Sequence, residues 1–372
     1  MKYHLWVGYI FLSFFLFINP YAYSSTNSQP ITKAINGTDA TLYAPLLLPW
    51  QAAIKQNSYD SISCGAVVIS EFWLLTAAHC NPIDIDEIAI AGTSLIKDGD
   101  FSDLDQKYQF KIKQIIPHPD YNEDYFLNDI TLLRVERSLY EVAQPIKIAT
   151  IEEQYLADIE FESSWITYGN SPATVIASGW GDTLEFNSPT TLQVITLAGV
   201  PDNQCNGLIL NDDQMVCADS NINGLIKDVC RGDSGGPLIW QNESNIMDSD
   251  KGIRLIGLTS NGQRCSIRIN ESENQYNQLT GQYTQVSTHR EWIEQQIRLH
   301  GKKPSFSLDD NSLRPTLDTD PFSVAKDIPD NNEEIIKNTY RSGGNISLNW
   351  LFSGLIIMIW RRNLTKRYKY NS

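Results

Sequence analysis

The chain has 372 residues, of which 42% are hydrophobic and 20% charged. This length suits about one to three domains, and the composition excludes a fibrous chain or one without a folded core. The net charge is −15, but seven of the 29 lysines and arginines lie at the two ends. The 44 acidic residues therefore leave residues 34–344 with a net charge of −22, which disfavours nucleic acid because its phosphates are also anionic.

The N-terminal segment has the order of parts of a secretory signal peptide. Lys2 precedes an apolar run at 5–18, which is followed by an Asn-Pro pair and the small-residue pattern at 22–24. The apolar run is short for a membrane span. We therefore predict a cleaved signal peptide at residues 1–24, rather than an uncleaved anchor or a buried helix.

The body, residues 34–300, alternates short β-branched and aromatic runs with turn residues. This spacing is typical of an all-β sandwich or barrel. A helix is predicted at 288–298, where Trp292, Ile293 and Ile297 recur at near-helical spacing. The expected strands are 63–70, 87–92, 110–116, 130–135, 173–180, 191–200, 238–241, 254–260 and 282–287.

The chain contains six cysteines. An even number in an exported chain favours disulfides over metal ligation, and no Cys-x-x-Cys or His-x-x-x-His pair is present. Fifteen pairings are possible, and the residues alone do not choose among them. No convincing calcium-loop pattern is present, so we predict no metal and no cofactor. The cysteines are Cys64, Cys80, Cys205, Cys217, Cys230 and Cys265.

The C-terminal part is predicted to be an acidic disordered linker at 301–342, rich in Asp, Asn, Pro and Ser, and then a tail at 343–372. In the tail, Gly343 and Gly344 precede an apolar stretch at 346–360 and a basic cluster. As a helix this stretch is roughly 22 Å long, so it spans a bilayer only with help from its basic flanks. The positive-inside rule then places the body outside. A GPI signal fits less well, because the polar spacer is missing.

The order of a glycine pair, a short apolar helix and a basic end resembles the GlyGly-CTERM sorting signal of Gram-negative bacteria. The resemblance implies a sorting protease of the rhombosortase type that cuts near Gly343. It also implies a path through the periplasm to the outer surface. A plain transmembrane anchor is the alternative.

Three short strings carry candidate catalytic chemistry. The first, Gly-Asp-Ser-Gly-Gly-Pro at 232–237, places Ser234 in a glycine-dense turn, where backbone N–H groups can surround an oxyanion. Alone it also matches α/β-hydrolases, in which the acid and the histidine follow the serine. Here Ala-Ala-His-Cys with His79 and Asp-Ile-x-Leu-Leu with Asp129 precede the serine. Chain order therefore disfavours an α/β-hydrolase.

In this order and spacing the strings resemble those of trypsin-like serine proteases of the chymotrypsin fold, from residue 34 to about 300. The resemblance implies an all-β fold of two six-stranded antiparallel β-barrels with a short C-terminal helix. It implies a serine endopeptidase with Ser234 as nucleophile, His79 as general base and Asp129 as the group that orients the imidazole. The N–H groups of Gly232 and Ser234 would form the oxyanion hole. The implied disulfides are Cys64–Cys80, Cys205–Cys217 and Cys230–Cys265.

The resemblance also implies a primary pocket for a basic side chain. Asp228, six residues before the nucleophile, corresponds to the pocket floor, and Gly262 and Gly281 to its open walls. A buried carboxylate there favours Arg or Lys in the substrate. Val229 replaces a serine common in the family, which favours Arg over Lys. Ser260 belongs to the substrate-binding segment, in which Asn261 replaces the usual tryptophan, so the preference beyond the primary pocket is open.

Activation is the other point at which the chain departs from the family. Cleavage after Lys33 would remove a propeptide, residues 25–33, and free Ala34 to pair with Asp233, but the family usually has Ile or Val at this position. We therefore expect the activated state to be less populated than in relatives. The leading hypothesis is an exported, zymogen-derived protease that cuts after Arg or Lys and needs an activating protease. The alternative is an inactive protease-fold binding protein at the cell surface.

Overall fold

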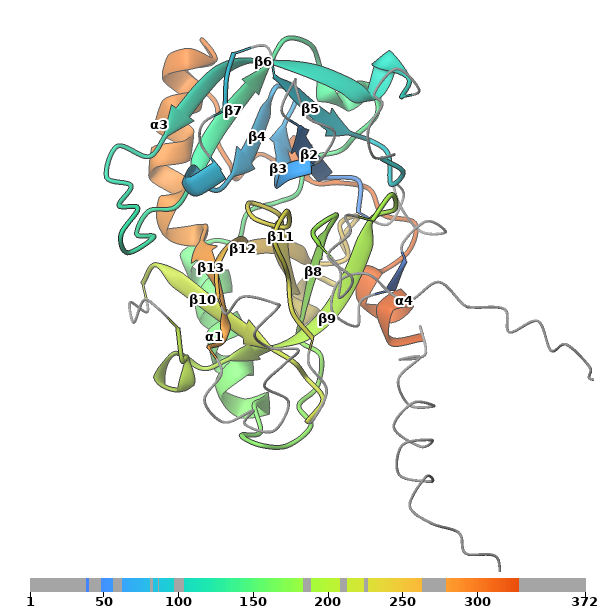
Figure 1. The fold of residues 1–372 in the computed structure, drawn as a ribbon, viewed down its shortest axis with the longest axis vertical. Coiled ribbons are helices and arrows are strands. Elements are labelled where there is room, and N and C mark those ends of the chain that lie inside the picture. The colour runs from blue at the N-terminus through green and yellow to red at the C-terminus, as the bar shows by residue number, and fades with distance from the viewer. Residues whose placement is uncertain are drawn as a thin grey trace, which may run out of the picture. The chain divides into compact units, whose positions relative to one another are not determined.

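The computed structural model describes residues 38–39, 48–55, 62–80, 83–85, 87–96, 104–182, 189–207, 213–223, 227–262 and 279–327. Their strands form two closed six-stranded antiparallel barrels that follow each other along the chain (Figure 1). The predicted fold of two barrels and a short C-terminal helix is confirmed.

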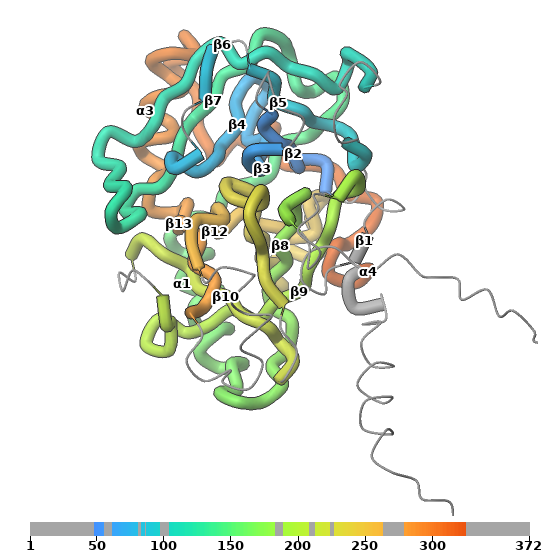
Figure 2. Tube along the Cα trace, in the orientation of Figure 1, coloured from blue at the N-terminus to red at the C-terminus, as the bar shows by residue number. Residues whose placement is uncertain are grey.

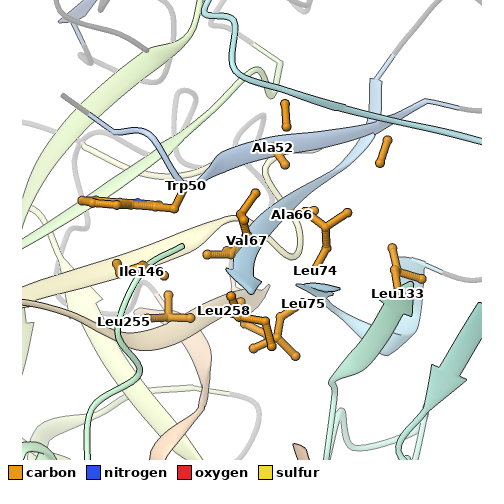
Figure 3. Packing of buried hydrophobic residues seen from close by; sticks show 14 of the residues in the cluster. Trp50, Ala52, Ala66, Val67, Leu74, Leu75, Leu133, Ile146, Leu255 and Leu258 are labelled. Atoms are coloured by element: carbon orange, nitrogen blue, oxygen red, sulfur yellow. The ribbon is translucent and has the colours of Figure 1, made fainter. Parts of the chain in front are cut away.

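The first barrel closes because β2 pairs with both β3 and β5. Its strands are largely built from β-branched and small apolar residues, and most of their side chains are buried; the exception is the strand at 109–117, in which only Phe110 and Ile112 are buried. Trp50, Val67 and Leu75 pack in its core together with Leu258 of the second barrel (Figure 3). In barrel order the strands are β2 (Gln51–Lys55), β3 (Ile62–Ser70), β4 (Trp73–Thr76), β7 (Thr131–Val135), β6 (Gln109–Pro117) and β5 (Ile88–Ala91).

The second barrel closes through the pairing of β8 with both β9 and β11. The short strand β1 (Thr38–Asp39) extends it at the edge of β9. In barrel order the strands are β8 (Val175–Gly179), β9 (Gln193–Val200), β10 (Met215–Asp219), β13 (Gly281–Gln285), β12 (Ile253–Asn261) and β11 (Pro237–Gln241).

Two longer helices accompany the barrels. The predicted terminal helix is α3 (Arg290–His300), which buries Ile293 and Ile297 in the core of the first barrel. Helix α1 (Ile151–Ser164) was not predicted. It begins at a capping box in which Thr150 and Glu153 each accept a hydrogen bond from the other's backbone N–H.

The chain after α3 corrects one prediction. Residues 301–327, which we call the strap, are not a disordered linker but an ordered segment packed on the barrels (Figure 2). It contains a 3₁₀ turn at Asn311–Leu313 and helix α4 (Pro321–Asp327), which contacts β9. Apolar residues spaced four or five apart suffice to attach an irregular segment to an existing core. They are Leu308, Leu313, Leu317 and Phe322, all buried.

Several predicted segments lie outside the described residues. These are the signal peptide, the activation site at Lys33 and Ala34, the rest of the predicted linker at 328–342, and the tail. Within the described ranges, none of the helices is both long enough and apolar enough to cross a membrane.

Candidate active site

His79 and Asp129 form a hydrogen-bonded pair beside the first barrel, where His79 follows β4 and Asp129 precedes β7. His79 lies in the 3₁₀ turn Ala78–Cys80, and its Nδ1 is 2.7 Å from Oδ2 of Asp129. The backbone N–H of His79 donates to Oδ1 of the same carboxylate at 2.8 Å. Asp129 is fully buried, and Thr284 Oγ1 donates to its carbonyl oxygen. An ionised carboxylate only accepts, so the Nδ1 that faces it carries a proton and Nε2 of neutral His79 is left as the proton acceptor.

Ser234 lies in the turn before β11, and β3 is bonded both to this turn and to the turn that carries His79. Gly65 N of β3 donates to the Ser234 carbonyl oxygen at 2.8 Å, and the neighbouring Cys64 forms a disulfide with Cys80. One stretch of β3 therefore holds both the serine and the histidine turn. In the described part of the chain no hydrogen bond joins the Ser234 hydroxyl to His79, so that contact stays a prediction.

The glycines of the serine turn are required by its backbone. Gly232 has φ +97° and Gly235 has φ +77°, in the region that L-residues rarely adopt. The N–H groups of Asp233, Gly235 and Gly236 donate to carbonyl oxygens within the fold. Among the described residues, those of Gly232 and Ser234 have no such acceptor, as an anion-binding pair requires.

The comparison with known proteins agrees with this geometry. The sequence profile of the trypsin family matches residues 35–293. The chain belongs to the trypsin family of serine proteases. Kallikrein-1 of Mus musculus is 29% identical over 265 residues, which cover 66% of this chain and 84% of the relative. A trypsin of Phaedon cochleariae is 29% identical over 287 residues, which cover 73% of this chain and 91% of the relative.

A third relative of this trypsin-family chain is longer. Vitamin K-dependent protein C of Oryctolagus cuniculus is 30% identical over 257 residues, which cover 67% of this chain and 49% of the relative. The match therefore spans about half the length of that protein.

The residues predicted for the primary pocket lie together. Asp228 is 4% exposed and accepts a hydrogen bond from Val229 N at 2.9 Å. A Cβ on Gly281 would lie 3.4 Å from Asp228 Oδ1, and a Cβ on Gly262 would lie 3.3 Å from the Gly281 Cα. A side chain at Gly281 would therefore fill the space beside the carboxylate, and one at Gly262 would lie against the Gly281 backbone. Ser260 donates its hydroxyl proton to Asp129 at 2.6 Å, and its predicted contact with substrate stays a prediction.

Asp233 is buried with backbone groups as its hydrogen-bond partners. Gly181 N donates to its Oδ1 at 2.7 Å and Cys230 N to its Oδ2 at 2.8 Å. Burial raises the pKa of this carboxyl to about 6. No lysine, arginine or histidine pairs with it in the described ranges. A nearby cation would therefore stabilise the charged form of this carboxylate.

Two of the three predicted disulfides are present, Cys64–Cys80 and Cys205–Cys217. Cys265 lies outside the described residues, so its pairing with Cys230 stays a prediction.

Two contacts of the site had no signal in the sequence. The Phe126 ring packs edge-on against the His79 imidazole, with centroids 5.6 Å apart, although its backbone has φ 52°. Asn261 donates from Nδ2 to Ser260 Oγ at 3.3 Å. The first contact joins residues that are distant along the chain, and the second depends on an irregularity in strand β12. No local sequence pattern predicts either contact.

Proposed function

We propose that this chain is a serine endopeptidase that cuts peptide bonds after Arg or Lys. The observation that carries the proposal is the pairing of His79 with the buried Asp129, together with the links from β3 to Ser234 and to the histidine turn. His79 Nε2 takes the Ser234 hydroxyl proton while Oγ forms a bond to the scissile carbonyl carbon. The N–H groups of Gly232 and Ser234 stabilise the oxyanion. His79 then protonates the leaving amine as the C–N bond breaks, and water repeats the steps to release the acyl group.

The preference for Arg or Lys rests on Asp228. A nearly buried carboxylate beside Gly281, which Gly262 faces in turn, leaves space for a long side chain that ends in a cation. An Asp228→Ala variant should lose most of its kcat/KM for an arginine ester, while hydrolysis of an ester with a small apolar side chain is less affected. Equal losses on both esters would contradict this specificity.

We also propose that the chain is a zymogen activated by cleavage after Lys33. The support is Asp233, whose buried carboxyl has backbone partners and a raised pKa, so a new N-terminal ammonium at Ala34 would stabilise its charge. Ala34 fills less space than the family's Ile, and such a core truncation costs about 2–5 kcal/mol. An Ala34→Ile variant, cleaved at Lys33, should show higher turnover, and unchanged turnover would contradict incomplete activation.

The direct test of the activity is hydrolysis of a small arginine ester by the cleaved chain and its Ser234→Ala variant. Hydrolysis that is lost in the variant supports the proposal. The second candidate, an inactive protease-fold binding protein, is favoured only by Ala34. It predicts no hydrolysis by the cleaved chain even with Ile at position 34.

Export and sorting are part of the same proposal. The two disulfides suit an oxidising compartment, and the sequence carries a signal-peptide pattern and a glycine-pair tail. The intact mass of the exported protein should show removal of residues 1–33 and a cut near Gly343. An unprocessed C-terminus would instead favour retention of the tail as a membrane anchor.

A further inference from the structure

The end of strand β12 carries a hydrogen-bond chain that leads to the catalytic carboxylate. Asn261 Nδ2 lies 3.3 Å from Ser260 Oγ, and Ser260 Oγ lies 2.6 Å from Asp129 Oδ2. Adjacent side chains on a regular strand point to opposite faces. Here the pairing with β13 is irregular between Thr259 and Asn261, and this lets the two side chains meet.

The direction of each bond follows from the groups themselves. Ser260 has one hydroxyl proton, and the Asp129 carboxylate can only accept it. Ser260 Oγ must therefore accept from its other neighbour, which requires the NH₂ group of Asn261 to face it. The protons thus point in one direction along the chain, from Asn261 to Ser260 to Asp129. His79 Nδ1 donates to the same Oδ2 from the other side.

The same orientation leaves the amide oxygen of Asn261 without a donor. Oδ1 is buried and accepts no hydrogen bond in the described part of the chain. A buried acceptor of this kind is costly to leave unsatisfied. Asn261 lies directly between Ser260 and Gly262, in the segment that borders the primary pocket.

We propose that Asn261 is a positioning residue that extends the hydrogen-bond chain of Asp129 to the substrate-binding edge, and that this edge shifts when a peptide binds, so that an N–H or O–H donor of the peptide reaches the buried Oδ1. The proposal rests on the proposed protease function. Donation by Asn261 polarises the Ser260 hydroxyl and makes it a better donor to Asp129. The carboxylate then attracts the Nδ1 proton of His79 less strongly, so binding at Asn261 and the charge at Asp129 are linked.

The first test removes the donor. In a Ser234→Ala background, Asn261→Leu should move the low-field NMR signal of the His79 Nδ1 proton further downfield, because Asp129 becomes a stronger acceptor. In the active enzyme the acid limb of the pH–rate profile should move up by roughly a few tenths of a pH unit. The exposed Asn223→Leu is the matched control and should change neither.

The second test concerns the acceptor. Asn261→Asp keeps the size and the acceptor oxygens but cannot donate when ionised. The ratio of kcat/KM for an extended peptide ending in Arg to that for a single-arginine ester should fall roughly 3- to 10-fold in Asn261→Leu and stay near the wild-type value in Asn261→Asp. Both variants should show the downfield NMR shift.

The outcomes separate the two proposals. An unshifted signal in folded Asn261→Leu, or an unchanged substrate ratio, overturns the role of Asn261 while the protease function stands. If the wild type hydrolyses neither substrate, the protease function fails, and the NMR comparison in Ser234→Ala still decides whether the hydrogen-bond chain exists. If Asn261→Leu does not fold, as judged by thermal unfolding, the NMR shift in Asn261→Asp decides.

Discussion

The strap offers a direct measure of how far the folded unit extends beyond α3. Leu308 is 2% exposed and belongs to the same core as Ile293 and Ile297 of α3. Its backbone N–H donates to Glu294 Oε1 at 2.8 Å, so the main chain is held as well as the side chain. A Leu308→Ala substitution should therefore lower the free energy of unfolding by about 2–5 kcal/mol, the range for buried leucines whose cavity does not collapse.

The matched control is Leu299→Ala, nine residues earlier on α3. Leu299 is 67% exposed, so its truncation should change the free energy of unfolding by no more than about 0.5 kcal/mol. Urea unfolding of both variants in the full chain, followed by tryptophan fluorescence, gives the two values. If Leu308→Ala costs no more than Leu299→Ala, the strap contributes nothing to the folded core and the reasoning is refuted.

Three further predictions concern stability. Arg254→Ala should cost about 3–5 kcal/mol in denaturant unfolding, because the buried Asp250 loses the nearer of its two cations, at 2.9 Å, and keeps only Arg314, at 3.8 Å. A cost under about 1 kcal/mol would contradict this. Burial lowers the pKa of His289 from 6.5 to about 4, so its contribution to stability is present above pH 6.5 and is lost as the pH falls towards 4, by up to about 3 kcal/mol. The difference in unfolding free energy between His289→Gln and the wild type should therefore shift by about that amount in favour of the variant between pH 7 and pH 4. A difference that does not depend on pH would refute this. Replacing both Cys64 and Cys80 by Ala should cost roughly 3 kcal/mol and reduce arginine-ester hydrolysis, and full activity in the folded variant would show that this disulfide does not position His79.

Local sequence patterns predicted most of the described strands but missed β1, β2, β4 and β10. Strands β3, β5, β6, β7, β8, β9, β11, β12 and β13 lie within two residues of their predicted bounds at each end. The strand β2 was missed because its residues, Gln-Ala-Ala-Ile-Lys, lack β-branched and aromatic runs, although all five are buried. Burial on both sides comes from the closed barrel, which no short window of sequence contains.

Helix α1 was missed for a related reason. Ala157 and Phe161 face the core, but Ile151, Tyr155 and Ile159 are exposed, so apolar residues lie on both faces. The periodicity that marks an amphipathic helix is therefore absent. The strap was misread because its composition is polar, while its few leucines have a core to join only after the barrels have formed.

The sequence by itself determined the family and the candidate catalytic residues, because the candidate nucleophile, base and acid lie in short strings whose order disfavours the α/β-hydrolase alternative. The tertiary structure decided what holds them. The Gly65 N–H donates a hydrogen bond to the Ser234 carbonyl oxygen. Asp129 accepts hydrogen bonds from His79 and Ser260, which lie 50 and 131 positions away along the chain. Such contacts depend on how the two barrels bring their loops together, and a local sequence pattern does not contain which distant residues become neighbours in the fold.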